Sequence, residues 1–195
     1  MRYLLIYCHP DPESFTSAVR DAALETLENA GHEVRQIALY EIGFNPVMDR
    51  AERAAYHNEG ENEAPVVWHL EQLFWAEGVI FVYPTWWYGL PAMLKGWLDR
   101  VLTPHQTFTM PTETDPIRGL VKNVRVLGVL TTCGAPWWFS FLIGQPGRKT
   151  ILRGLRPLFA ARCKTFYLAH YLMDTSTPES RAKHLERVRR KLARL

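Results

Sequence analysis

The sequence predicts a single α/β domain built around a parallel β-sheet, and three observations lead to that prediction. Short runs of apolar and β-branched residues, typical of strands buried on both faces, recur along the chain. Segments with apolar residues at helical spacing separate these runs, and the first strand, helix and strand are complete within about 40 residues. The 195 residues fit one domain, 1–195, with no internal repeat or linker.

The first strand, helix and strand open the chain. Residues 2–8 predict a buried strand, and Ser14 is a favourable N-cap for a helix that is expected to end at Gly31. Residues 32–39 predict the second strand. Residues 40–65 are irregular, and a connection of this length without regular structure is usually functional or interfacial.

The stretch over 78–101 organises the rest of the chain. A helix over 65–76 leads into a buried strand, which is expected to stop at Pro84. Three aromatic residues occupy the turn that follows, and Pro91 is expected in the first turn of the next helix. Ligands bind at the carboxyl edge of open α/β sheets, so these rings favour a flat aromatic ligand over simple core packing.

The remaining segments complete a sheet of five strands. Residues 105–122 predict a loop or short hairpin, residues 123–130 the fourth strand, and residues 161–169 the fifth. A helix is expected over 149–155 and a last one from Pro178 onward.

Composition narrows the class of protein. Hydrophobic residues make up 47% of the chain and charged residues 22%, as in ordinary soluble proteins. No apolar run approaches the ~20 residues that cross a bilayer, and the N-terminus lacks the features of a signal peptide, so no membrane insertion is expected. Three widely spaced cysteines fit a reducing cytoplasm and argue against disulfides and a zinc site, so no metal is expected.

The net charge of +3 is unevenly distributed, because residues 181–195 contain seven Lys or Arg and one Glu. A basic helix can bind nucleic acid or an acidic partner. Positive charge near a helix C-terminus, together with an apolar stripe, instead predicts a helix that docks on its own domain. The second interpretation is favoured, and nucleic acid is not expected as a partner.

Three turns, over 9–17, 84–89 and 131–139, are expected to meet at the carboxyl edge of the sheet. The first places hydroxyl residues at a helix N-terminus, where free N–H groups and the helix dipole favour a phosphate. The other two supply rings, small residues and hydroxyls, which can stack on a flat ring and bind its polar edge. Neither a P-loop nor a Rossmann glycine pattern occurs, which argues against a nucleoside triphosphatase and a standard nicotinamide-binding fold.

The motifs HPDPESFTS, PTWWYGLPAMLKGWLDRV and TTCGAPWW resemble those of the flavodoxin-like NAD(P)H:quinone oxidoreductase family, the relatives of DT-diaphorase. The resemblance covers most of the chain, from Tyr3 to about Leu168. It implies a flavodoxin-like, doubly wound sheet of order 2-1-3-4-5 with helices on both faces and a tightly bound FAD or FMN. It further implies NADPH or NADH as hydride donor, a quinone-like acceptor, ping-pong kinetics and a cytoplasmic homodimer with its active site at the interface.

Carried over by position, the first turn would hold the phosphate region of the flavin, and the other two would line its isoalloxazine ring. The first group is His9, Ser14, Phe15 and Thr16. The second group is Pro84, Thr85, Trp86, Trp87, Tyr88, Thr131, Thr132, Cys133 and Gly134. The substrate pocket is expected to contain Trp137, Trp138 and Phe139. No side chain is assigned a catalytic role, because the flavin carries the hydride.

The chain departs from the family pattern at several positions. Cys133 replaces the first glycine of a Thr-Thr-Gly-Gly turn and is expected to line the site as a small residue, with a reactive thiol as the alternative. Phe139 and Gln145 stand near the places of a Tyr and a His that assist proton movement in the mammalian enzymes, and neither can relay a proton. The missing C-terminal extension leaves FAD and FMN both open. Arg148 and Lys149 could contact a nicotinamide cofactor phosphate or face solvent.

Two other functions remain open. Some relatives are flavin-binding regulatory subunits of cation transport systems, and the basic last helix could dock on such a partner. An electron carrier like flavodoxin is the other alternative. The aromatic turns and long loops favour a substrate pocket over such a carrier.

Overall fold

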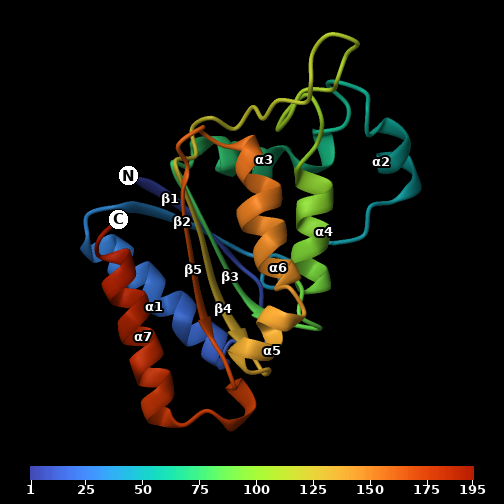
Figure 1. Cartoon of the computed structure of the whole chain (residues 1–195). Coiled ribbons are helices and arrows are strands. Elements are labelled where there is room, and N and C mark those ends of the chain that lie inside the picture. The colour runs from blue at the N-terminus through green and yellow to red at the C-terminus, as the bar shows by residue number, and fades with distance from the viewer.

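The computed structural model describes residues 1–195 and contains one sheet of five parallel strands in the order β2-β1-β3-β4-β5 (Figure 1). The strands are β1 (Arg2–Tyr7), β2 (Glu33–Ala38), β3 (Gly78–Thr85), β4 (Val126–Cys133) and β5 (Lys164–His170). Helices lie on both faces. The predicted flavodoxin-like, doubly wound fold is therefore confirmed, including its strand order.

Two helical layers enclose the sheet. The α-helices are α1 (Phe15–Asn29), α2 (Arg50–Ala55), α3 (Val67–Trp75), α4 (Ala92–Val101), α5 (Trp137–Leu142), α6 (Pro146–Lys149) and α7 (Pro178–Leu192). The shorter or irregular helices are η1 (Ala64–Val66), the π-helix η2 (Thr150–Leu155), η3 (Arg156–Leu158) and η4 (Met173–Thr175). Figure 1 shows α1 and α7 on one face of the sheet, with α3, α4 and the helix continuing from α6 on the other.

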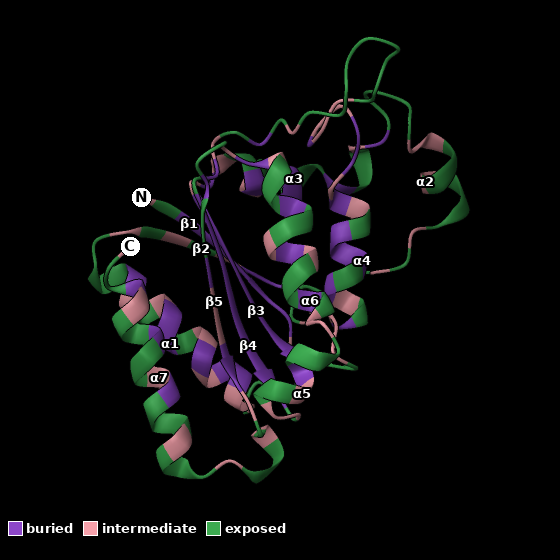
Figure 2. Ribbon diagram, viewed as in Figure 1, coloured by how far each residue is buried: buried purple, intermediate pink, exposed green.

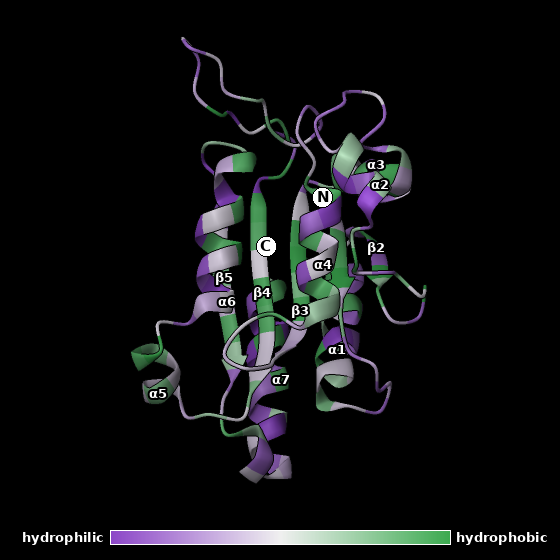
Figure 3. Cartoon of the chain, turned by 90° about the vertical axis from the view of Figure 1, so that its right-hand side faces the viewer, coloured by the Kyte–Doolittle hydropathy of each residue, from purple (hydrophilic) through white to green (hydrophobic).

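Alternation along β1 divides the core between the two layers, because successive strand residues point to opposite faces. Tyr3, Leu5 and Tyr7 belong to the apolar cluster that includes buried residues of α1 and α7. Leu4 and Ile6 belong to the cluster that includes buried residues of α3 and α4. The three inner strands β1, β3 and β4 are buried along nearly their whole length, whereas the edge strands β2 and β5 are partly exposed (Figure 2). Figure 3 shows the hydrophobic character of β3 and β4 between the flanking helices.

Strand β3 continues through Pro84 to Thr85, so the prediction that Pro84 ends the strand was wrong. The pairing of β3 with β1 ends at Val82, whereas its pairing with β4 continues through Pro84 to Thr85. At Pro84 the strand has a neighbour on one side only. A residue without an N–H is tolerated at such an edge position.

Strand β4 lies three residues later than predicted. Asn123 was assigned to the strand, but its side-chain amide donates hydrogen bonds to the carbonyls of Leu73 and Ala76 at the end of α3. Thr131 and Thr132, which were assigned to a turn, pair with β3 and β5 inside the sheet. Because Thr is a good strand former, the small and polar composition of this segment did not identify a turn.

Two helix boundaries also differ from prediction. Pro91 is the N-cap of α4, one position before its first turn. The helix expected over 149–155 belongs to a longer helical run that begins at Pro146 and includes the π-helix η2. The last helix docks as expected, because His184, Val188 and Leu192 of α7 are buried. None of these helices has the length and apolar character needed to cross a membrane.

Candidate active site

The order of the strands creates a crevice at the carboxyl end of the sheet. The chain leaves β1 toward β2 on one side and later returns to β3 on the other, so the connections after β1 and β3 diverge. Ligands bind at such a switch point in open α/β sheets. A cavity of about 810 Å³ lies here, lined by residues that follow β1, β3 and β5 and by the end of β4 and the turn after it. Its size is typical of a small-molecule or cofactor site.

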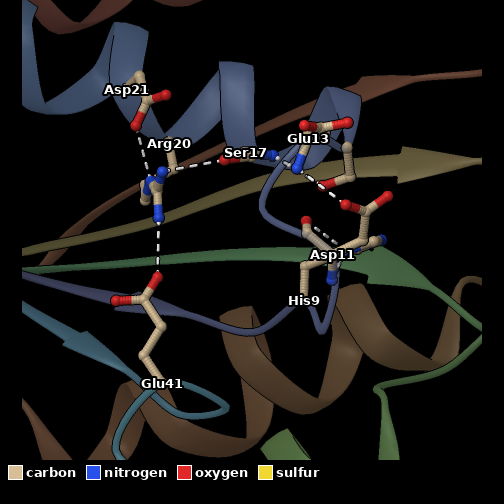
Figure 4. A network of polar contacts seen from close by, with 8 residues as sticks. His9, Asp11, Glu13, Ser17, Arg20, Asp21 and Glu41 are labelled. Carbon is tan, nitrogen blue, oxygen red and sulfur yellow. Dashed lines mark hydrogen bonds and ion pairs between the residues drawn. The ribbon is translucent and has the colours of Figure 1, made fainter.

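The turn between β1 and α1 forms one wall of this cavity. Asp11 donates its backbone N–H to His9 Nδ1 at 3.0 Å, and Glu13 donates its N–H to Asp11 Oδ1 at 2.8 Å (Figure 4). Ser14 caps α1 by accepting the N–H of Ser17 at 3.1 Å. The N–H groups of the first helical residues, Phe15 and Thr16, donate to no other group of the chain. A helix N-terminus with free N–H groups is an anion-binding structure.

Arg20 links the first turn of α1 to neighbouring elements. Its guanidinium donates to Ser17 Oγ at 2.9 Å and forms ion pairs with Asp21 at 2.7 Å and Glu41 at 3.2 Å (Figure 4). The same guanidinium lies 4.6 Å from the centroid of the Tyr7 ring in β1. These contacts join α1, β1 and the loop after β2, so the anion-binding turn rests on a fixed support.

The turn after β3 places aromatic rings at the cavity. Trp87 and Tyr88 have positive φ angles of 48° and 62°, a conformation that is uncommon for bulky residues. The turn is closed by a hydrogen bond from the N–H of Gly89 to the carbonyl of Trp86 at 3.0 Å. Trp86 lies beside His9, with 6.2 Å between ring centroids, and Trp87 is 94% exposed. Strained backbone of this kind is concentrated at functional sites.

Threonine hydroxyls connect the strands beneath the cavity. Thr16 and Thr132 have their Oγ1 atoms 3.2 Å apart, which ties α1 to the end of β4. Thr85 and Thr131 are joined in the same way at 2.9 Å between β3 and β4. Cys133 Sγ lies 3.4 Å from Ser140 Oγ of α5. The walls of the cavity are therefore linked to one another by side-chain hydrogen bonds.

The structure brings most of the predicted site residues to this one cavity. Those that line it are His9, Ser14, Phe15, Thr16, Pro84, Thr85, Trp86, Trp87, Tyr88, Thr132, Cys133 and Gly134. Thr131 is buried beneath the cavity and does not line it. The cavity is also lined by Ala135, Met173 and Asp174, which the sequence analysis missed. The carboxyl end of β5 opens onto the same edge, and this position in the topology could have identified Met173 and Asp174.

The predicted substrate residues lie beside the cavity, outside its lining. Phe139 of α5 packs edge-on against Tyr88, with ring centroids 5.8 Å apart, and Trp138 packs on Phe139 at 5.5 Å. Trp137 and Trp138 are 65% and 55% exposed. Helix α5 projects from this end of the molecule (Figure 3). Together with Trp87, it presents an exposed apolar surface next to the cavity.

A small recess behind the cavity contains two tyrosines. Gln145 donates its side-chain amide to Tyr171 Oη at 3.1 Å. Tyr167 and Tyr171 line the recess together with Thr85, Tyr88 and Cys133, which also line the main cavity. Burial raises the pKa of both tyrosines. The sequence analysis found no proton-carrying side chain at Phe139 or Gln145, but it did not consider Tyr171, which follows the fifth strand.

Two histidines pack behind Phe15. His170, at the end of β5, lies 5.1 Å from Phe15 between ring centroids, and His184 of α7 lies 5.2 Å from His170. Both ring nitrogens of His184 are buried without a hydrogen-bond partner. Burial, with additional repulsion from His170 and Arg187, lowers the pKa of His184 to about 4. This imidazole is consequently neutral in the folded protein near neutral pH.

The sequence is similar to a known family model and to named relatives. A family model described as "Flavodoxin-like fold" matches residues 1–195. NAD(P)H dehydrogenase (quinone) 1 of Rattus norvegicus is 32% identical over 155 residues, which cover 71% of this chain and 56% of the rat protein. An uncharacterized NAD(P)H oxidoreductase of Haemophilus influenzae is 33% identical over 132 residues, covering 67% of this chain and 64% of that protein. The chain thus spans less than two thirds of either relative.

Solved structures share the fold along almost the whole chain. The NAD(P)H:quinone oxidoreductase from Methanothermobacter marburgensis superposes with a TM-score of 0.81 at 24% identity, covering 99% of this chain and 98% of that one. An FMN-dependent NADH-azoreductase from Bacillus anthracis, solved in complex with FMN, gives a TM-score of 0.78 at 20% identity with the same coverage. At these identities the similarity concerns the fold.

Proposed function

The chain belongs to the flavodoxin-like family, and from this membership we propose that it is a flavin-dependent NAD(P)H:quinone oxidoreductase. The observation that carries the proposal is the cavity of about 810 Å³ at the switch point of the sheet. It combines a helix N-terminus suited to phosphate with a turn of three aromatic residues. The names of the relatives in rat and Haemophilus influenzae support the same reaction class.

The residues of the cavity fit a flavin mononucleotide unit. The free N–H groups of Phe15 and Thr16 would hold its phosphate, since a phosphate accepts hydrogen bonds from a helix N-terminus. Trp86 and Tyr88 would position its ring and keep water from one edge. A bound flavin would supply the redox chemistry of hydride transfer between NADH or NADPH and a quinone-like acceptor. We propose FMN or FAD in this role, and chromatography of the flavin released by heat distinguishes the two.

The reaction would follow ping-pong kinetics, because donor and acceptor would use the same aromatic slot in turn. Parallel lines in initial-rate plots against both substrates are expected. Lines that intersect would show that both substrates bind together and would contradict this part of the proposal.

We further propose that the chain forms a homodimer with the cavity at its interface. Support comes from the apolar residues that α5 and the aromatic turn expose beside the cavity, since such patches mark interaction sites. They are Trp87, Trp137, Trp138, Phe141 and Leu142, each more than half exposed. Light scattering after size-exclusion chromatography tests this, and Phe141→Glu is expected to produce monomers. The three free, buried cysteines are in keeping with a cytoplasmic location.

An absorbance spectrum of the purified protein, followed by NADPH or NADH under argon, tests the proposed function. We expect a flavin band near ~450 nm that bleaches on mixing and returns when a quinone is added. A protein that takes up neither FMN nor FAD on reconstitution would contradict the proposal.

The exposed basic face of α7 supports a second candidate, a flavin-binding subunit that docks on a cation transport protein. Bound flavin that neither nicotinamide nucleotide reduces would favour this function over the enzyme.

A further inference from the structure

A second cavity of about 530 Å³ lies beside α6 and the helical turns that follow it. We call it the basic groove. Its walls come from α5, from the segment over 144–156, which becomes helical at Pro146, and from β5 at the edge of the sheet (Figure 1). The lining residues are Phe141, Gly144, Gln145, Arg148, Lys149, Leu152, Arg153, Arg156 and Thr165.

Four of these residues are cations, and no carboxylate lines the groove. Arg148, Lys149, Arg153 and Arg156 are exposed, and none of them forms an ion pair. Like charges three or four residues apart on a helix repel and reduce stability. A concave surface with cations alone also concentrates positive potential and attracts anions. The charge of the groove therefore favours a ligand with several negative charges.

The groove and the main cavity both adjoin the small recess described above. Gln145 and Arg148 line both the groove and the recess. The recess in turn shares Thr85, Tyr88 and Cys133 with the main cavity. From Arg148 the chain continues through η2 to Arg156 at the start of η3. The basic groove and the main cavity therefore lie near each other, separated by the residues of the recess.

Arg148 is held in place where the groove adjoins the recess. It donates from Nη1 to Gln145 Oε1 at 2.8 Å, and its guanidinium lies 5.0 Å from the centroid of the Tyr167 ring. Gln145 is fixed by its own hydrogen bond to Tyr171. An ordered guanidinium loses less conformational freedom when it binds, and its planar fork matches phosphate oxygens.

We propose that the basic groove binds the phosphates of NADPH and makes this nucleotide the preferred hydride donor. The inference rests on the proposed function. With the nicotinamide in the main cavity, the pyrophosphate would reach Arg148 and Lys149 first, and the adenosine 2′-phosphate would reach Arg153 and Arg156 at the far end. NADH has the pyrophosphate but lacks the 2′-phosphate, so only NADPH uses the far end of the groove.

Calorimetry with nucleotides that carry no nicotinamide tests the groove independently of turnover. The flavin-loaded protein is titrated with 2′,5′-ADP and, as the matched probe that lacks only the 2′-phosphate, with 5′-AMP. We expect 2′,5′-ADP to bind at least about tenfold more tightly, since hydrogen bonds to charged groups are the stronger ones. The double variant Arg153→Ala/Arg156→Ala should abolish this difference, and Arg153→Lys/Arg156→Lys should restore part of it.

Kinetics with the two donors provide the second measurement. The Ala double variant should lower kcat/KM for NADPH by about tenfold or more and change that for NADH by much less. Arg148→Ala should lower both, because both donors carry the pyrophosphate. Arg162 is an exposed cation outside the groove, so Arg162→Ala is the matched control and should change neither.

Equal binding of 2′,5′-ADP and 5′-AMP, or an NADPH preference that survives the Ala double variant, would overturn the proposal. A protein that binds 2′,5′-ADP through these arginines but holds no flavin would refute the proposed function and leave the phosphate site supported.

Discussion

Replacing the buried His184 with leucine is expected to make the protein more resistant to mild acid. His184 lies in α7 with 2% of its surface exposed, and neither ring nitrogen has a partner. Leucine has a similar size and extends the apolar stripe formed by Val188 and Leu192. The substitution removes a group that must stay neutral for the helix to pack, and it removes no hydrogen bond.

The pKa shift gives the sign and the size of the effect. Burial lowers the pKa of His184 from 6.5 to about 4. The unfolded chain therefore binds a proton between these values while the folded protein does not, so stability falls as the pH decreases through this window. One pKa unit corresponds to about 1.4 kcal/mol, and lowering the pH from 7 to 5 should cost the wild-type protein about 2 kcal/mol through His184 alone. The variant should avoid this loss.

Urea denaturation of both proteins at pH 7 and pH 5 measures the difference. His57 is exposed, and His57→Gln serves as the control that should keep the pH dependence of the wild type. If His184→Leu loses as much stability as the wild type between the two pH values, the argument from burial is refuted.

Three further substitutions test the local structure. Ser14→Ala removes the cap of α1 and should cost about 1 kcal/mol in thermal denaturation, whereas Ser14→Asp should keep most of it. Gly96→Ala should destabilise the protein by about 1–3 kcal/mol in urea denaturation, although alanine favours helices. The reason is that the new Cβ would lie 2.2 Å from the carbonyl oxygen of Pro46. A stabilised variant would contradict this contact. Glu52→Ala should cost about 3 kcal/mol because it leaves the mostly buried Arg100 without its carboxylate, and Glu52→Leu/Arg100→Met should recover most of that loss.

The fold was predictable because its inner strands β1, β3 and β4 are buried on both faces and therefore appear in the sequence as mainly apolar runs. Errors arose where neighbouring strands decide the outcome. Pro84 stays in β3 because β1 has already ended beside it, and Thr132 is in β4 because β3 and β5 continue next to it. Neither fact is visible in a single segment of sequence.

Part of the candidate site was predictable from local sequence signals and part of it was not. The turns after β1 and β3 contain local signals, a helix cap and a group of aromatic residues, and both line the cavity. Met173 and Asp174 line it without such a signal, because only the position of β5 in the sheet brings them there. The basic groove is formed by a helical run against an edge strand, so the sequence showed only its first two cations.

The backbone contact between Gly147 and the aromatic turn restricts how this site can change. A Cβ at Gly147 would lie 3.2 Å from the carbonyl carbon of Gly89, and the Gly147 N–H faces the carbonyl of Tyr88 at 3.5 Å. The turn over 84–90 and the start of α6 therefore fit each other closely, and a change in the backbone of one requires a change in the other. Exchange of the turn between homologous proteins should succeed only when the segment over 144–149 is transferred with it, and directed evolution of acceptor range should yield paired changes in the two segments.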